Sequence, residues 1–276
     1  MKSIETSLRA GKAQGAAVAH TRSFELFARS GFIARGLIYG IVGVLAVKLA
    51  LGDAGGKTTN QQGALKTIAH QPFGHTLLIA MAIGLAGYAI WRLVRAWLGH
   101  GIAVQDSSFE RIAGFASGIV YAGLCVAAIS TLSGSGGKSG STQKTTAGVL
   151  GWTGGAWIVG IAGVVFVGIG LYQAQKGLSK SFLEDSKTEQ MSSREQRLIT
   201  VLGVVGHLAR GVVFVLVGYF LAKAAIDYKP SQAIGLDGAL SKLAQNSYGP
   251  VLLGVVSAGL VAFGAYSISD ARYRKI

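Results

Sequence analysis

The stretch GFIARGLIYGIVGVLAVK, residues 31–48, decides the fold because the chain nearly repeats it as GHLARGVVFVLVGYFLAK, residues 206–223. Each stretch is apolar over almost the length of about 20 residues that a helix needs to cross a bilayer. The two stretches align without a gap, and each carries an arginine at its fifth position, Arg35 and Arg210. A charge inside an apolar helix is costly and therefore rare, so its presence twice at the same depth indicates an internal repeat.

The repeat extends beyond these two stretches at the same offset of 175 residues. Residues 63–65 and 238–240 both read GAL, and Gly74, Gly84 and Leu85 fall on Gly249, Gly259 and Leu260. A weaker middle copy, AGFASGIVYAGLCVAAIS at 113–130, places Ser117 at the arginine position and Tyr121 at the position of Tyr39. The chain therefore reads as three two-helix units in tandem.

Composition and charge indicate a membrane protein. Of the 276 residues, 50% are hydrophobic and 14% are charged, and the mean hydropathy is +0.47. Soluble domains carry about 25% charged residues. The formal net charge of +14 would suit a nucleic-acid partner, but Lys and Arg cluster between and beyond the apolar stretches, which is the positive-inside pattern. We therefore expect no nucleic-acid partner and a chain with both termini in the cytoplasm.

The expected fold is an all-α integral membrane protein. It has six transmembrane helices, arranged as three parallel two-helix repeats around a pseudo-threefold axis, with both termini cytoplasmic. The candidate spans are residues 31–51, 74–97, 112–133, 156–176, 198–222 and 250–269. The expected domains are a basic cytoplasmic N-terminal tail (1–29), repeat 1 (30–99), repeat 2 (110–180), a cytoplasmic linker (181–197) and repeat 3 with a basic C-terminus (198–276).

Two quoted motifs carry a family resemblance. ARGLIYG, residues 34–40, followed by GALKTIAHQPFGHTLLIAMAIGLAGYAIWRL, residues 63–93, resembles the DUF1206 family. Members of that family are bacterial membrane proteins built from three tandem two-helix repeats. The resemblance implies this fold and a multi-pass location in the bacterial cytoplasmic (inner) membrane, and it implies no activity and no catalytic residues.

The two arginines allow three interpretations. They lie near the cytoplasmic ends of their helices, where a long side chain can snorkel to lipid phosphates. Alternatively, Arg35, Ser117 and Arg210 form a ring on the pseudo-threefold axis that binds an anion or a lipid head group through the guanidinium groups. The third interpretation is an ion pair with Asp270 or Glu110, which lie near the same membrane edge.

Other polar and aromatic side chains have simpler expected places. Tyr39, Tyr121 and Phe214 follow the ring positions by four residues, so they are expected to line the axis one turn deeper. Tyr88, Tyr172 and Tyr266 are expected at the membrane interface. The expected anchors at the outer interface are Lys48, Lys223, Trp152 and Trp157.

Signals for chemistry are weak throughout the sequence. Cys125 lies in an apolar stretch and is expected to be a packing residue, and His207 is expected to be packed and hydrogen-bonded. The histidines and carboxylates suggest no metal site, no cofactor and no catalytic set, so we expect no enzyme. Two functions stay open: a membrane scaffold or anionic-lipid-binding protein, or a small anion or solute channel with the ring at its cytoplasmic mouth. A second copy or another membrane protein is an open partner.

Overall fold

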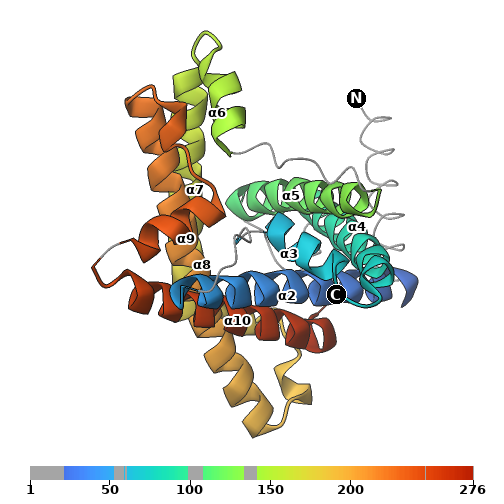
Figure 1. The fold of residues 1–276 in the computed structure, drawn as a ribbon. Helices are drawn as coiled ribbons and strands as arrows, with labels where there is room; N and C mark the ends of the chain where they lie inside the picture. The colour runs from blue at the N-terminus through green and yellow to red at the C-terminus, as the bar shows by residue number, and fades with distance from the viewer. Residues whose placement is uncertain are drawn as a thin grey trace, which may run out of the picture.

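Each of the six apolar stretches forms one long helix in the computed structural model, which describes residues 22–52, 59, 61–98, 108–133, 142–245 and 247–275 (Figure 1). The long helices are α2 Arg22–Ala50, α4 Gly74–Leu98, α5 Ser108–Leu132, α7 Gly155–Leu178, α8 Ser193–Ile226 and α10 Gly249–Tyr273. The all-α prediction is confirmed for the described residues. Most of the expected basic tail, residues 1–21, lies outside them.

Five of these helices are long and apolar enough to cross a membrane, namely α2, α4, α7, α8 and α10. In α5 the apolar part identified among the described residues is shorter, Ser117–Leu132. The sequence predicted six spans, so the structure supports five of them directly. Five such helices indicate a multi-pass membrane protein.

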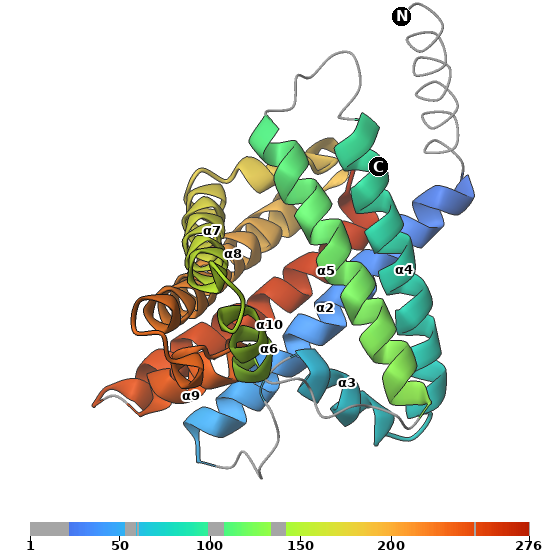
Figure 2. The same cartoon turned by 90° about the horizontal axis from the view of Figure 1, so that it is seen from above.

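Three short helices, which the sequence analysis did not separate from the loops, follow the first long helix of each unit. They are α3 Gln61–Ala69, α6 Thr142–Leu150 and α9 Leu236–Ala244. They occupy equivalent positions in the three repeats. Figure 2 shows all three at one end of the molecule, which we call the short-helix end. The opposite end, called the linker end, holds residues 179–192 and the C-terminal residues 273–275.

The long helices pack most extensively between units: α2 lies against α10, α4 against α5, and α7 against α8. Glycines permit close backbone approach at these interfaces. A Cβ at Gly36 of α2 would lie 2.7 Å from the carbonyl oxygen of Gly264, and a Cβ at Gly211 of α8 would lie 2.8 Å from that of Gly170. Gly36 and Gly211 are repeat equivalents, so the two interfaces share one register.

Within units the packing is unequal. The two long helices of repeat 1, α2 and α4, pack against each other, and so do α8 and α10 of repeat 3. Among the described residues, α5 and α7 of repeat 2 share no comparable interface, and they lie apart in Figure 2. The ring of six helices is therefore closed at five of its six junctions.

The linker between repeats 2 and 3 is tied to the C-terminus. It contains the 3₁₀ turns η1 Ser181–Leu183 and η2 Thr188–Gln190. The backbone N–H of Lys187 donates to the carbonyl of Tyr273 (2.7 Å), and that of Lys275 donates to the carbonyl of Asp185 (2.9 Å). Ser192 starts α8 through a capping box with Glu195. These bonds hold the linker against the end of α10.

Candidate anion-binding site

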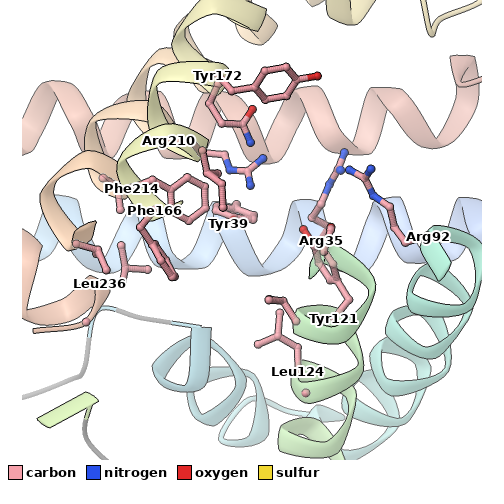
Figure 3. Close-up of a pocket in the computed structure, with 18 of the residues that line it drawn as sticks. Arg35, Tyr39, Arg92, Tyr121, Leu124, Phe166, Tyr172, Arg210, Phe214 and Leu236 are labelled. Atoms are coloured by element: carbon pink, nitrogen blue, oxygen red, sulfur yellow. The ribbon is translucent and has the colours of Figure 1, made fainter. Parts of the chain in front are cut away.

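A cavity of about 820 Å³ lies between α2, α5, α7, α8 and α10 (Figure 3). Its volume falls in the range of about 300–1,000 Å³ that is usual for ligand pockets. Arg35, Ser117 and Arg210 all line it, and so do Tyr39, Tyr121 and Phe214 one turn deeper. The structure thus brings all six residues of the expected ring and axis lining to one cavity.

Arg35 is buried and fully engaged by neighbouring side chains. It is 6% exposed. Its Nη1 donates to the hydroxyl of Tyr88 (2.7 Å), its Nε donates to Ser267 Oγ (2.6 Å), and its Nη2 pairs with Asp270 Oδ2 (3.3 Å). Snorkelling therefore does not describe Arg35. The ion pair with Asp270, one of the three interpretations, is what the structure contains, while the side chain of Glu110 lies outside the described residues.

Arg210 has a different environment. Its guanidinium carbon lies over three aromatic rings: 4.3 Å from the centroid of Phe263, 4.8 Å from Tyr39 and 5.3 Å from Phe214. Its Nε is buried and without a hydrogen-bond partner within the described part of the chain. No carboxylate there pairs with Arg210. Cation–π contacts stabilise a cation without neutralising its charge, so Arg210 presents an uncompensated charge to the cavity.

The repeat explains why the two arginines differ. The position equivalent to Tyr88 in repeat 3 is occupied by Phe263, 175 residues later, which has no hydroxyl to accept a hydrogen bond. Asp270 lies on the helix that packs against α2, and its equivalent on α7, the helix that packs against α8, is Lys176, 94 residues earlier. Arg210 therefore has no counterpart of the Tyr88 hydroxyl or of the Asp270 carboxylate, which both bind Arg35.

An ion-pair network borders the cavity at the linker end. Asp185 Oδ2 pairs with Arg274 Nη2 (2.8 Å) and with Lys176 Nζ (3.3 Å), and Arg274 Nη1 reaches Asp270 Oδ2 (3.5 Å). Burial is the largest single influence on the pKa of the Arg274 guanidinium and lowers it, but Asp270, Asp185, Tyr266 and Tyr88 together raise it, so the pKa lies above its ordinary value. Arg274 therefore stays charged and joins the linker to α10.

Charge is unbalanced across the cavity lining. Among the described residues, six cationic side chains line it, together with two carboxylates, Asp185 and Asp270. The cations are Arg35, Arg92, Arg111, Lys176, Arg210 and Arg274. Toward the short-helix end the lining becomes apolar, with Leu124, Val159, Phe166, Val217 and Leu221, and ends among threonines of α6. The cavity is cationic at one end and apolar over much of its remaining length.

Two expected interfacial tyrosines are placed differently by the structure. Tyr88 is 0% exposed and Tyr266 is 2% exposed, so the prediction that they face the membrane interface is wrong for both. Tyr88 is buried because its hydroxyl serves Arg35 and also accepts from Arg92 Nε (3.2 Å). Tyr172, the third, is half-buried and lines the cavity.

The remaining expected residues have ordinary surroundings. Trp152 and Trp157 are exposed at the short-helix end, and Lys48 and Lys223 are exposed in the last turns of α2 and α8. His207 is buried, with Nδ1 2.7 Å from the carbonyl oxygen of Gly203 and its ring stacked on Phe182. The thiol of Cys125 points to the carbonyl of Ala82 (3.3 Å). Among the described residues no group of three His, Cys, Asp or Glu is placed to hold a metal ion.

Sequence reasoning missed the contributions of Arg92, Arg274 and Asp185 to the cavity. In the sequence, Arg92 and Arg274 are two of many basic residues near the ends of the spans, and Asp185 lies in the linker. One signal was present: Asp270 and Arg274 are four residues apart at the end of the last span, a spacing that brings opposite charges together on one helix face.

Comparison with known proteins identifies a family and a relative. The model of the family described as "Domain of Unknown Function (DUF1206)" matches three tandem segments, residues 30–99, 112–180 and 205–274. An uncharacterized protein YxxB of Bacillus subtilis (strain 168) is 34% identical over 251 residues, which cover 90% of this chain and 90% of that protein. No solved structure matches. The matched segments bear out the three-repeat organisation.

Proposed function

The chain belongs to the DUF1206 family, and we propose that it is a non-enzymatic membrane protein that binds an anionic lipid, with the head group at Arg210. The observation that carries this proposal is the uncompensated Arg210 guanidinium in a cavity whose lining holds six cations and two carboxylates. An isolated charge at this depth is costly. A bound phosphate would offset that cost, because a guanidinium pairs with it bidentately.

The architecture that accompanies this function is a six-span bundle with a pseudo-threefold axis and both termini cytoplasmic. The shared register of the Gly36 and Gly211 interfaces supports the axis. The length of α5, 25 residues, supports a sixth span. The linker end would then face the cytoplasm of a bacterial cell, where the excess of Lys and Arg would also attract anionic lipids of the inner leaflet.

The first test uses repeat equivalence as a design rule. In α10, Asp270 pairs with Arg35, and the equivalent residue in α7 is Lys176. Lys176→Asp therefore gives Arg210 the kind of carboxylate partner that Arg35 has. We expect the affinity for inorganic phosphate and for phosphatidylglycerol to fall at least tenfold, about 1.4 kcal/mol. Binding would be measured on purified protein in neutral detergent, by calorimetry for phosphate and by native mass spectrometry for the lipid.

The matched control is Lys180→Asp. Lys180 is exposed, lies at the same end and does not line the cavity, yet the substitution makes the same change in charge. Its affinity should stay within twofold of wild type. Equal losses of affinity in the two variants would show that only the overall charge matters. The proposal would be refuted if the wild type bound no inorganic phosphate and bound phosphatidylglycerol no better than phosphatidylcholine.

A second candidate function is a small anion or solute channel with Arg35, Ser117 and Arg210 at its cytoplasmic mouth. The observation in its favour is that the cavity lining reaches from Arg274 at the linker end to Thr142 at the short-helix end. Chloride or phosphate flux into liposomes tests it, with Arg210→Met beside wild type. Flux above that of empty liposomes, altered in the variant, would favour the channel over lipid binding.

A further inference from the structure

We infer that the cavity exchanges its ligand sideways with the bilayer, through the seam between α5 and α7, and that the ligand is an anionic amphiphile of the linker-end leaflet. The inference rests on the proposed function for its head-group chemistry. It adds the route and the requirement for an apolar chain.

The first observation is that this junction differs from the other five. The junctions α2–α10, α7–α8 and α4–α5 between units, and α2–α4 and α8–α10 within units, are all packed. In the described parts of α5 and α7 no comparable packing joins the two helices. Repeat 2 thus lacks the within-unit interface of its two sister repeats.

The second observation is that the cavity follows the seam along both helices. On α5 its lining runs from Arg111 to Ala127, and on α7 from Ile158 to Lys176. Two apolar members of this lining are strongly exposed, Val120 at 61% and Ile158 at 50%. Together with the missing packing between α5 and α7, these exposed lining side chains support an opening of the cavity along the seam.

The third observation is the polarity of the seam. Its cations lie at the linker end, with Arg111 on α5 and Lys176 on α7. Below them the two helices offer Val120, Leu124 and Phe166, among other apolar lining residues. A membrane lipid in the linker-end leaflet has the same order, with a polar head at the surface and a chain toward the bilayer centre. Charge complementarity selects an anionic head group.

The linker end supplies a further argument for a sideways route. There the Asp185–Arg274 pair and the backbone bonds between residues 185–187 and 273–275 tie the linker to the C-terminal residues beside the cavity. A molecule coming from water at the linker end would have to pass this bonded segment or cross between Arg111 and Lys176. A lipid already in the membrane needs only the seam.

The test compares two tryptophans on α5. Val120→Trp adds bulk in the seam, whereas Val126→Trp adds the same bulk at a position that is equally exposed, 63% against 61%, but does not line the cavity. Each variant is placed in phosphatidylcholine vesicles that contain a trace of spin-labelled phosphatidylglycerol. Electron paramagnetic resonance then gives both the immobilised lipid fraction and its rate of exchange with the bulk bilayer. Spin-labelled phosphatidylcholine corrects for lipid that merely surrounds the protein.

We expect wild type to immobilise an excess of phosphatidylglycerol over phosphatidylcholine. Val120→Trp should slow the exchange at least fivefold and leave the excess unchanged, because an obstructed portal slows entering and leaving alike. Val126→Trp should match wild type, and inorganic phosphate should bind all three proteins equally. Exchange at the wild-type rate in Val120→Trp overturns the inference, and so does a reduced excess at an unchanged rate, which would mean that Trp occupies the ligand's space.

If Val120→Trp does not fold, a second pair of variants, at Gly123 and Gly168, tests the inference. Gly123 on α5 lines the cavity, Gly168 on α7 does not, and a Cβ at either glycine meets nothing within 4 Å. Gly123→Phe should therefore slow exchange, and Gly168→Phe should not. Failure of the proposed function looks different: wild type then shows no excess of phosphatidylglycerol at all, whereas failure of the portal leaves that excess in place.

Discussion

At the scale of single residues, Arg35 and Arg210 show how a repeat can give one side chain two roles. Both lie five residues into equivalent stretches, but Arg35 meets Tyr88, Ser267 and Asp270, and Arg210 meets aromatic rings. Removing one partner of a buried ion pair is costly because the other charge stays behind. Removing Arg210, which is half-buried and has no carboxylate partner in the described residues, leaves no opposite charge uncompensated. Stability and function should therefore separate at these two positions.

We expect Arg35→Met to destabilise the protein and Arg210→Met not to. Arg35→Met should lower the free energy of unfolding by about 3–5 kcal/mol, because Asp270 would keep only its longer contact to Arg274. Arg210→Met should leave stability unchanged or raise it, because methionine fits the aromatic surroundings and leaves no buried donor without a partner. Unfolding in mixed micelles with increasing SDS measures both. Equal destabilisation of the two variants would show that Arg210 has a partner of its own.

How far the sequence predicts the site also depends on single residues. The 175-residue offset identifies Arg35 and Arg210 as equivalent residues. The spacing of four residues predicts that Tyr39 and Phe214 lie one helical turn deeper on the same faces. Which way the helices face is not contained in a repeat, so the burial of Tyr88 did not follow from its position near a helix end. It follows from a hydrogen bond to a side chain 53 residues away.

At the scale of helices, glycine positions set the distance between units. Gly170 on α7 would place a Cβ 2.7 Å from the carbonyl oxygen of Gly211, whereas Gly168, two residues earlier on the same helix, has open space. In the sequence the two glycines look alike, since both lie within one apolar helix. Only the structure separates the glycine that is in contact from the one that is not.

We expect Gly170→Ala to destabilise the protein by about 1–3 kcal/mol, since overpacking against backbone forces the helices apart. Gly168→Ala should be neutral or stabilising by up to about 1 kcal/mol, because alanine favours helix without a steric cost at this position. The SDS titration used for the arginine variants measures both changes. A neutral Gly170→Ala would mean that the α7–α8 interface is looser than its backbone distances indicate.

The short helices α3, α6 and α9 show what hydropathy alone does not reveal. Each has nine residues, too few to cross a membrane, so a search for apolar spans assigns them to loops. The sequence indicates α3 and α9 only through the GAL that they share, at residues 63–65 and 238–240. In α6 the corresponding residues are Lys144, Thr145 and Thr146, which hides the third copy from sequence comparison.

At the scale of the whole molecule, three similar units enclose a cavity because one of them has diverged. Repeat 2 has Ser117 in place of an arginine and Lys176 in place of Asp270, and in the described parts of α5 and α7 it lacks the packed junction of the other repeats. The first change removes a cation, the second puts a cation where repeat 3 has a carboxylate, and the third opens a side. A solid scaffold would have no use for such divergence, whereas a protein that holds a charged lipid needs an open side, an unpaired cation and an apolar wall.

The seam faces the lipid only if α5 crosses the membrane, and the number of spans tests whether it does. We expect Gly101→Cys and Ser139→Cys, on either side of α5, to react with a membrane-impermeant maleimide from opposite faces of the bacterial inner membrane. Residue 101 would be cytoplasmic, since Arg92, Arg95 and Arg111 flank it and positive charge favours that side. The chain has one native cysteine, so Cys125→Ala provides the unreactive background. Labelling of both positions from one face would leave α5 outside the bilayer, with an odd number of spans and no membrane-facing seam.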